Sequence, residues 1–207
     1  MGRFVLLLLL VFGIGTAGAA SLEGKKAPAL ALKDPAGTPR TLREIANGRP
    51  AVVLFWASWC PYCKALMPPL AKIADGYGRD RIAVIAVDVW EDDSADARPV
   101  IEQGGFGFDF LMKGDKQTKA WGVKGTPGLF VVDRAGIVVY DRSARPVKAA
   151  PEGAPKSTPA SSAEHWCKDV RSALDASLAS AAPAAAAATT NQPYSATRLP
   201  PANFVRQ

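Results

Sequence analysis

The chain has 207 residues, of which 48% are hydrophobic and 21% are charged. These values are typical of one globular domain with extensions, so they exclude a wholly disordered or a fibrous chain. The formal net charge is +6, but Lys and Arg form no run longer than two residues, so we expect no nucleic-acid partner. Three cysteines and one histidine are too few for a disulfide-stapled small fold, but they suffice for one reactive site.

Residues 1–20 have the pattern of a secretory signal peptide. Arg3 precedes an apolar stretch at 4–12, and small residues follow that stretch as far as Ala20. We expect cleavage near Ala20, which would place the mature chain in the periplasm or another extracytoplasmic space, where disulfides persist. In one alternative, residues 4–20 remain as a membrane anchor, because together they approach the length of a spanning helix. A buried core helix is a third interpretation.

Residues 21–142 alternate between strand and helix patterns. Continuous apolar runs at 51–57 and 82–89 are typical of strands buried on both faces of a sheet. Apolar residues at helical spacing lie between them, at about 61–77, so the two strands are predicted to be parallel in a βαβ unit. Further predicted elements are a helix at 94–103 weakened by Pro99, a strand at 108–112, a helix at 115–121, and a hairpin of strands 129–133 and 137–141. The prediction is an α/β fold with a central mixed sheet flanked by helices.

The C-terminal third differs in composition from this domain. Residues 143–161 are rich in Pro, Ala and Ser, which indicates a linker or a long exposed loop. Ser161 and Glu164 have the spacing of a capping box and predict a helix at 162–180. That helix is amphipathic, with apolar residues at intervals of four: Trp166, Val170, Leu174 and Leu178. Residues 181–207 lack apolar periodicity and are predicted to be disordered.

Cys60 and Cys63 stand where the first buried strand ends and the helix begins. A thiol at a helix N-terminus faces unpaired backbone N–H groups and the positive end of the helix dipole, and both favour the thiolate. We expect Cys60 to be the more exposed thiol and to attack a partner disulfide. Cys63, one turn further on, would resolve the mixed disulfide. Pro61 suits the first helical position, where its missing N–H costs little.

Other uses of the cysteines were weighed. Cys60 and Cys63 would form half of a zinc site that His165 and Cys167 complete, or a plain structural disulfide. Redox use is favoured, because the compartment and the place of the pair in a βαβ unit agree with it. Cys167 is then expected to be a free or half-buried thiol, with an intermolecular or a regulatory disulfide as alternatives. His165 is interpreted as a solvated helix residue, and the acidic run that begins at Glu91 as a solvated loop.

Three segments in this order resemble the thioredoxin superfamily. Residues 55–64, Phe-Trp-Ala-Ser-Trp-Cys-Pro-Tyr-Cys-Lys, are similar to its active-site segment. Gly125-Thr126-Pro127 resembles its cis-proline loop, and residues 133–136 resemble its hairpin turn. Residues 27–37 look like the N-terminal β-hairpin extension of the exported TlpA/ResA-like branch, which includes the cytochrome-c-maturation thioredoxins. The resemblance implies a thioredoxin-like fold over 21–142, closed by the helix at 162–180.

The resemblance also implies a thiol–disulfide oxidoreductase, with Cys60–Cys63 as its redox-active disulfide and no further cofactor or metal. In such a protein the substrate docks beside Pro127, and Thr126 pairs with an extended substrate segment. Trp59 would shape the docking surface, although a partly buried core position is the alternative for it. Pro61 and Tyr62 between the cysteines influence the stability of the thiolate and therefore the reduction potential.

Two departures from the family pattern concern proton transfer. Leu54 and Leu66 stand where thioredoxin or some TlpA/ResA-like proteins carry an acid. The proton of Cys63 must then pass to water, to Lys64 or to another group, which weakens the case for a strong reductase.

The function predicted from the sequence is thiol–disulfide exchange with cysteine-containing exported proteins, apocytochrome c being one example. As a reductase the protein would need a membrane thiol electron donor to restore Cys60 and Cys63. The alternatives are a disulfide oxidase or isomerase, or a metal-binding protein or metallochaperone that uses the same two cysteines. We expect a monomer, because the chain shows no dimerisation module of the kind that isomerases use.

Overall fold

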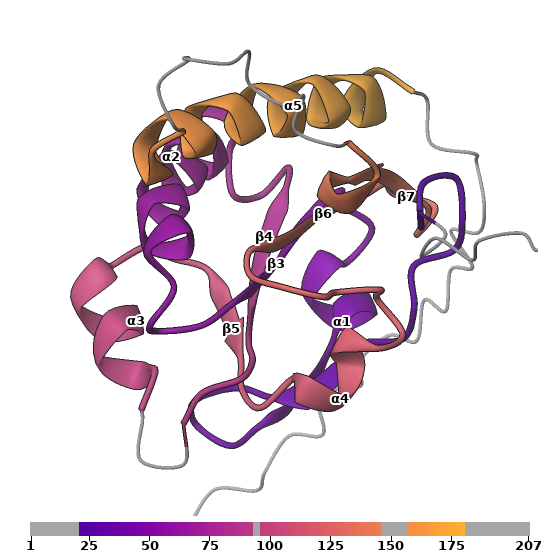
Figure 1. Ribbon diagram of the computed structural model, residues 1–207. Helices are drawn as coiled ribbons and strands as arrows, with labels where there is room; N and C mark the ends of the chain where they lie inside the picture. The colour runs from indigo at the N-terminus through magenta and orange to yellow at the C-terminus, as the bar shows by residue number, and fades with distance from the viewer. Residues whose placement is uncertain (1–20, 93–95, 146–156, 181–207) are drawn as a thin grey trace, which may run out of the picture.

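The structure is a computed structural model that describes residues 21–92, 96–145 and 157–180. Its centre is a five-stranded sheet in the order β5-β4-β3-β6-β7 (Figure 1). β3 pairs in parallel with β4, and β4 with β5, whereas β6 is antiparallel to both β3 and β7. The strands are β3 (Ala51–Trp56), β4 (Ala83–Asp88), β5 (Asp109–Leu111), β6 (Gly128–Val132) and β7 (Val138–Asp141). The predicted mixed sheet, its parallel βαβ unit and its C-terminal hairpin are confirmed.

Every residue of β3 is buried, because helices and loops cover both faces of the sheet. Side chains alternate along a strand, so Leu54 and Trp56 point to one face while Val53 and Phe55 point to the other. The first face forms a hydrophobic core with α2 (Pro61–Tyr77) and α5 (Pro159–Ala179). The second face packs against Ile45 and Trp121. This two-sided burial explains the continuous apolar run in the sequence.

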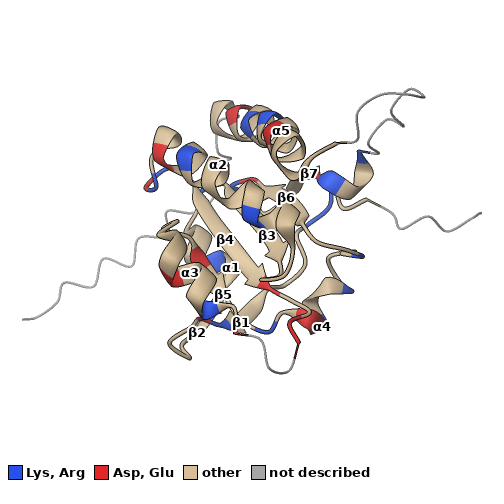
Figure 2. Ribbon diagram, turned by 60° about the vertical axis from the view of Figure 1, so that its left-hand side comes forward, with Lys and Arg blue, Asp and Glu red and all other residues tan. Residues whose placement is uncertain are grey.

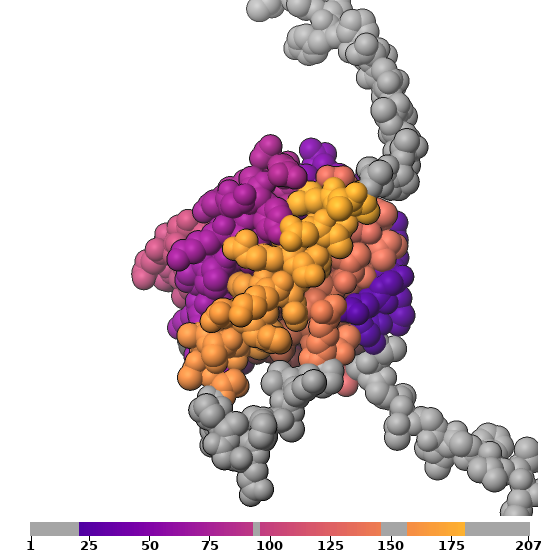
Figure 3. All heavy atoms as spheres, turned by 90° about the horizontal axis from the view of Figure 1, so that it is seen from above, coloured from indigo at the N-terminus to yellow at the C-terminus, as the bar shows by residue number. Residues whose placement is uncertain are grey.

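The helices lie in two layers around the sheet. α2 and α5 lie together on one face, where α5 crosses over α2 and the edge of the sheet near β7 (Figures 1 and 3). α3 (Arg98–Gly104) packs against the same core through Val100 and Ile101. α1 (Leu42–Ala46) and α4 (Asp115–Thr118) belong to the other side. Charged residues lie mostly on helices and loops around the sheet (Figure 2).

Two predicted helix starts are wrong. α5 begins at Pro159, and its N-cap is Thr158, whose side chain accepts a hydrogen bond from the backbone N–H of Ser161 at 3.1 Å. Ser161 therefore closes a capping box instead of opening one. α3 begins at Arg98 rather than 94, so Pro99 lies in the first turn, where it is tolerated. The five-residue α1 was not predicted, because it is too short to show helical periodicity.

The predicted N-terminal hairpin is confirmed as β1 (Ala31–Lys33) paired antiparallel with β2 (Pro39–Thr41). Asp34 holds its turn by accepting the backbone N–H of Thr38 at 2.9 Å. The predicted signal at 1–20, the linker residues 146–156 and the tail at 181–207 lie outside the described residues. Within the described residues, no helix combines the length and the hydrophobicity needed to cross a membrane.

Candidate active site

Cys60 is the N-cap residue of α2. β3 ends at Trp56 and α2 begins at Pro61, so a short loop carries Cys60 to the edge where β3 and β4 end. The backbone N–H of Cys63 donates a hydrogen bond to the Cys60 sulfur over 3.2 Å. Proline occupies the first turn, as predicted. Cys60 therefore lies at the N-terminus of α2, as expected from the sequence.

The two thiols of the pair have opposite acidities. The pKa of Cys60 is lowered to about 6, chiefly because the Cys63 thiol hydrogen-bonds to its sulfur. Hydrogen bonds from the Thr126 side chain and from the backbone N–H groups of Cys63 and Tyr62 lower this pKa further, whereas burial opposes them. Burial raises the pKa of Cys63 well above its ordinary value, and the hydrogen bond with Cys60 adds to the rise. At neutral pH, Cys60 is therefore the thiol of the pair that ionises more readily.

Both cysteines are almost fully covered. The exposed fraction is 2% for Cys60 and 0% for Cys63, so Cys60 is the more exposed of the two, as expected, but only slightly. Both are free thiols, and the structure represents the dithiol form. Beside them the side chain of Trp59 is 53% exposed, and its indole N–H donates to the carbonyl oxygen of Trp90 at 2.8 Å. Trp59 is thus a surface residue next to the pair and not a core aromatic.

The loop before β6 faces the pair. The peptide bond between Thr126 and Pro127 is cis, as the resemblance implied, and the Thr126 side chain lowers the pKa of both thiols of the pair. Gly128 follows at the start of β6, where an added Cβ would lie 2.9 Å from the Val123 side chain. Glycine thus allows the loop to approach the core closely enough to bring residues 126 and 127 beside the pair.

Arg142 was not identified from the sequence. Its Nε–H donates to the carbonyl oxygen of Pro127 at 2.8 Å. Its guanidinium carbon lies 4.9 Å from the ring centroid of Trp166 on α5, whose ring lies 6.2 Å from that of Tyr62. Tyr62 is therefore linked through the closing helix to the cis-proline loop. Nothing local in the sequence marks Arg142, because all of these partners lie far from it along the chain.

Glu91 corrects the interpretation of the acidic run as a solvated loop. Its carboxylate accepts the Ser58 hydroxyl at 2.6 Å and also accepts the Ser58 backbone N–H. Ser58 precedes the cysteine pair by two residues, so Glu91 holds the loop that carries Cys60. The signal was present in the sequence, because Ser58 and Glu91 follow two parallel neighbouring strands, whose ends meet at one edge of the sheet.

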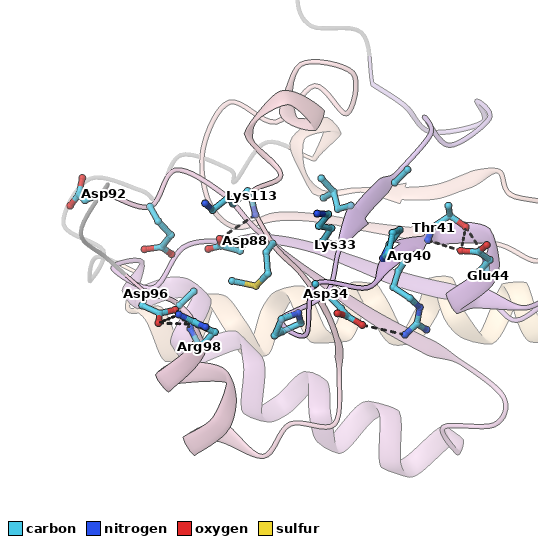
Figure 4. A pocket seen from close by; sticks show the side chains of 18 residues that line it. Lys33, Asp34, Arg40, Thr41, Glu44, Asp88, Asp92, Asp96, Arg98 and Lys113 are labelled. Carbon is cyan, nitrogen blue, oxygen red and sulfur yellow. Dashed lines mark hydrogen bonds and ion pairs between the residues drawn. The ribbon is translucent and has the colours of Figure 1, made fainter.

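Leu54 and Leu66 are fully buried in the apolar core, so neither position supplies a carboxyl group. Asp88 at the end of β4 is a buried acid that the sequence analysis missed. Burial, and then hydrogen bonding with Glu91, raise its pKa to about 7. Its carboxylate accepts the backbone N–H of Lys113 at 3.4 Å and lines a cavity of about 1250 Å³ beside the N-terminal hairpin (Figure 4). That cavity is lined by neither cysteine of the pair.

Cys167 lies apart from this chemistry. It is a free thiol, 7% exposed, and burial raises its pKa to about 11. A thiol with this pKa is a poor nucleophile at neutral pH. Across residues 21–92, 96–145 and 157–180, no three His, Cys, Asp or Glu side chains are close enough to hold a metal ion. Cys60, Cys63, His165 and Cys167 therefore do not form the zinc site that was considered from the sequence.

The mixed sheet, the Cys-x-x-Cys pair at the N-terminus of α2 and the cis-proline beside it define a thioredoxin-like protein. Residues 24–141 match the AhpC/TSA family, and the chain belongs to that family. Among solved structures, a putative thiol:disulfide interchange protein DsbE from Chlorobium tepidum is 26% identical, with a TM-score of 0.58. That comparison covers 75% of this chain and 99% of the other.

Two curated relatives are named for thiol–disulfide chemistry. The thiol:disulfide interchange protein HelX of Rhodobacter capsulatus is 36% identical over 123 residues, which are 58% of this chain. The thiol-disulfide oxidoreductase ResA of Bacillus anthracis is 31% identical over 117 residues, or 56% of this chain. The chain spans 66% of the length of each of these relatives, just under two thirds.

Proposed function

We propose that this protein is an exported thiol–disulfide oxidoreductase that exchanges the Cys60–Cys63 couple with cysteines of secreted or membrane proteins. The observation that carries the proposal is the opposite pKa shift of two thiols in one helical turn, beside the cis-proline Pro127. The names of the curated relatives support the same chemistry. The signal pattern of residues 1–20 supports an extracytoplasmic location, with residues 4–20 either removed or kept as an anchor.

In the reductive direction the Cys60 thiolate attacks a substrate disulfide. The substrate S–S bond breaks, a mixed disulfide forms on Cys60, and the first substrate sulfur leaves as a thiolate. Cys63 then loses its proton and attacks the Cys60 sulfur, which releases the second substrate thiolate. The net reaction moves two electrons and two protons to the substrate and leaves a Cys60–Cys63 disulfide. A membrane thiol donor would restore the dithiol, and the proposal requires no further cofactor.

One observation favours the opposite direction as a second candidate. A lowered Cys60 pKa stabilises the reduced form of the couple and makes its disulfide more oxidising. The apolar Leu54 and Leu66 provide no acid for the proton of Cys63. The reduction potential of the couple in glutathione buffers separates the two candidates. A value of about −270 mV supports the reductase, and one of about −120 mV supports a disulfide donor.

Reduction of insulin disulfides by dithiothreitol tests the exchange itself. Cys60→Ser is expected to abolish catalysis, and Cys63→Ser to retain the attack but accumulate the mixed disulfide. Cys167→Ala is the matched control, because it removes the third thiol away from the pair, and it is expected to retain activity. Catalysis that survives Cys60→Ser would contradict the proposal. Stoichiometric metal that stays bound to Cys60 and Cys63 after chelation would instead favour the metallochaperone.

A further inference from the structure

A small cavity of about 290 Å³ adjoins the cis-proline loop on the side of β7. Its walls come from residues 122–125, from Gly128 and Leu129 at the start of β6, and from Arg142 and Ser143. The two charged side chains in its lining, Lys124 and Arg142, are both cations, and no Asp or Glu lines it. The cavity therefore offers positive charge immediately beside the place where a substrate would dock.

Arg142 is held in one orientation by two contacts. Its Nε–H donates a hydrogen bond to the carbonyl oxygen of Pro127, and one face of its guanidinium lies over the ring of Trp166. The described residues supply no hydrogen-bond acceptor for its two terminal amino groups. The adjacent carboxylate of Asp141 accepts its hydrogen bonds from Ser21, Leu22 and Ser143 instead. The free edge of a pre-oriented guanidinium matches the two oxygens of a carboxylate.

Burial disfavours the charged form of Arg142 and lowers its pKa. Arg142 is a half-buried cation, and water and the described residues compensate its charge only partly. An anionic group on the substrate would therefore interact favourably with it. Gly125 and Gly128 line the cavity and lie on either side of Thr126 and Pro127 in the sequence. A substrate strand that pairs with Thr126 would therefore lie close to this cavity.

We propose that Arg142 and Lys124 form a subsite for one Asp or Glu side chain of the substrate polypeptide. This inference rests on the proposed function, because it assigns a substrate preference to the same exchange site. The carboxylate would accept hydrogen bonds from both terminal amino groups of Arg142. The ammonium group of Lys124, which is more exposed, would add a weaker electrostatic attraction. The preferred substrates would then be cysteine-containing chains with an acidic residue close to the reacting cysteine.

A panel of short peptide disulfides tests the subsite, each with a single Glu or its isosteric Gln within three residues of the cysteine. We expect one position at which Glu raises kcat/KM by about tenfold or more over Gln, because a charge-assisted bidentate pair is stronger than hydrogen bonds to a neutral amide. Arg142→Met and Lys124→Gln should lower this ratio, Arg142→Met toward one. The quantity compared is the ratio for each variant, so a general loss of rate does not affect it.

Arg145→Met is the matched control, since Arg145 also lies 4.9 Å from an aromatic ring centroid, that of Tyr140, but does not line the cavity. It should keep the preference for Glu. In the wild-type protein the ratio should also fall as the pH drops below the pKa of a peptide Glu, about 4.3, which needs no variant.

The outcomes separate this inference from the proposed function. If no peptide exchanges its disulfide with the wild-type protein, the proposed function fails. If the peptides exchange but Glu and Gln are equal at every position, or the preference for Glu survives Arg142→Met, the subsite is refuted while the exchange activity stands.

Discussion

The backbone nitrogen of Cys63 lies 3.2 Å from the sulfur of Cys60 and its N–H donates a hydrogen bond to that sulfur, so the second cysteine of the pair favours the thiolate of the first. The Cys63 thiol is also the largest cause of the lowered Cys60 pKa. Hydrogen bonding between the two residues favours the thiolate of Cys60 and keeps the proton on Cys63, so the Cys60 thiol becomes more acidic and the Cys63 thiol less acidic. The reactivity of the pair follows from this asymmetry.

Removing the Cys63 thiol should weaken the Cys60 thiolate. In Cys63→Ala we expect the Cys60 pKa to rise from about 6 toward the ordinary value, because the largest cause of its depression is lost while the backbone N–H groups remain. Thiolate absorbance at 240 nm, followed against pH in a Cys167→Ala background, measures the change. A pKa that stays near 6 would mean that the helix N-terminus alone sets it.

The two exchange steps should differ in pH dependence. The attack by Cys60 should level off above about pH 7, since its pKa is about 6 and the thiolate then predominates. Resolution by Cys63 should continue to accelerate up to at least about pH 9, because burial, the main cause of its raised pKa, persists in the mixed disulfide. Acid quenching and mass spectrometry of the mixed disulfide separate the steps. A common plateau would show that another group removes the proton of Cys63.

Glu91 should stabilise the loop that carries Cys60. In Glu91→Ala the Ser58 hydroxyl and N–H lose their carboxylate partner. We expect the free energy of unfolding to fall by about 1–3 kcal/mol, the cost of leaving partly buried donors unpaired. Urea denaturation measures it, with Asp92→Ala, a change in the neighbouring exposed carboxylate, as the control. Equal stability of the two variants would contradict a net stabilising role for Glu91.

Asp88 should make the folded state less stable as the pH rises. Its pKa is about 7 in the folded state and about 3.9 when unfolded, so the folded protein retains a proton that the unfolded chain releases between these values. The destabilisation accumulates through that window and is complete above about pH 7. Asp88→Asn removes the charge, so it should raise the melting temperature clearly at pH 8 and less at pH 5. An equal shift at both pH values would contradict the raised pKa.

Asp141, at the end of β7, is a second buried acid, and we expect its substitution to have the opposite effect on stability from the substitution of Asp88. Its carboxylate accepts hydrogen bonds from Leu22, Ser21 and Ser143. Asp141→Asn replaces one accepting oxygen by an amino group and should therefore lower the melting temperature of the protein. The pair of variants tests whether hydrogen-bond partners, rather than burial itself, decide the sign of the effect.

Much of the fold was predictable because it depends on short-range patterns. The runs that became β3 and β4 are apolar throughout, since both faces of the sheet are covered, and α2 shows its periodicity between them. Helix starts were less predictable. Thr158 and Ser161 both suit an N-cap, and the choice between them depends on how α5 docks against α2.

The sequence by itself placed one thiol at a helix start and a second thiol one turn later, because this arrangement depends on residue types at close spacing, and the family resemblance supplied the expectation of a cis-proline loop. Only the tertiary structure decided what surrounds them. It brought Glu91 to Ser58, Arg142 to Pro127 and Trp166, and Asp88 into a buried position. These groups come from separate elements, and no local pattern encodes a contact made by packing one element against another. Burial and contacts made by this packing raise the pKa of Asp88 and lower that of Arg142.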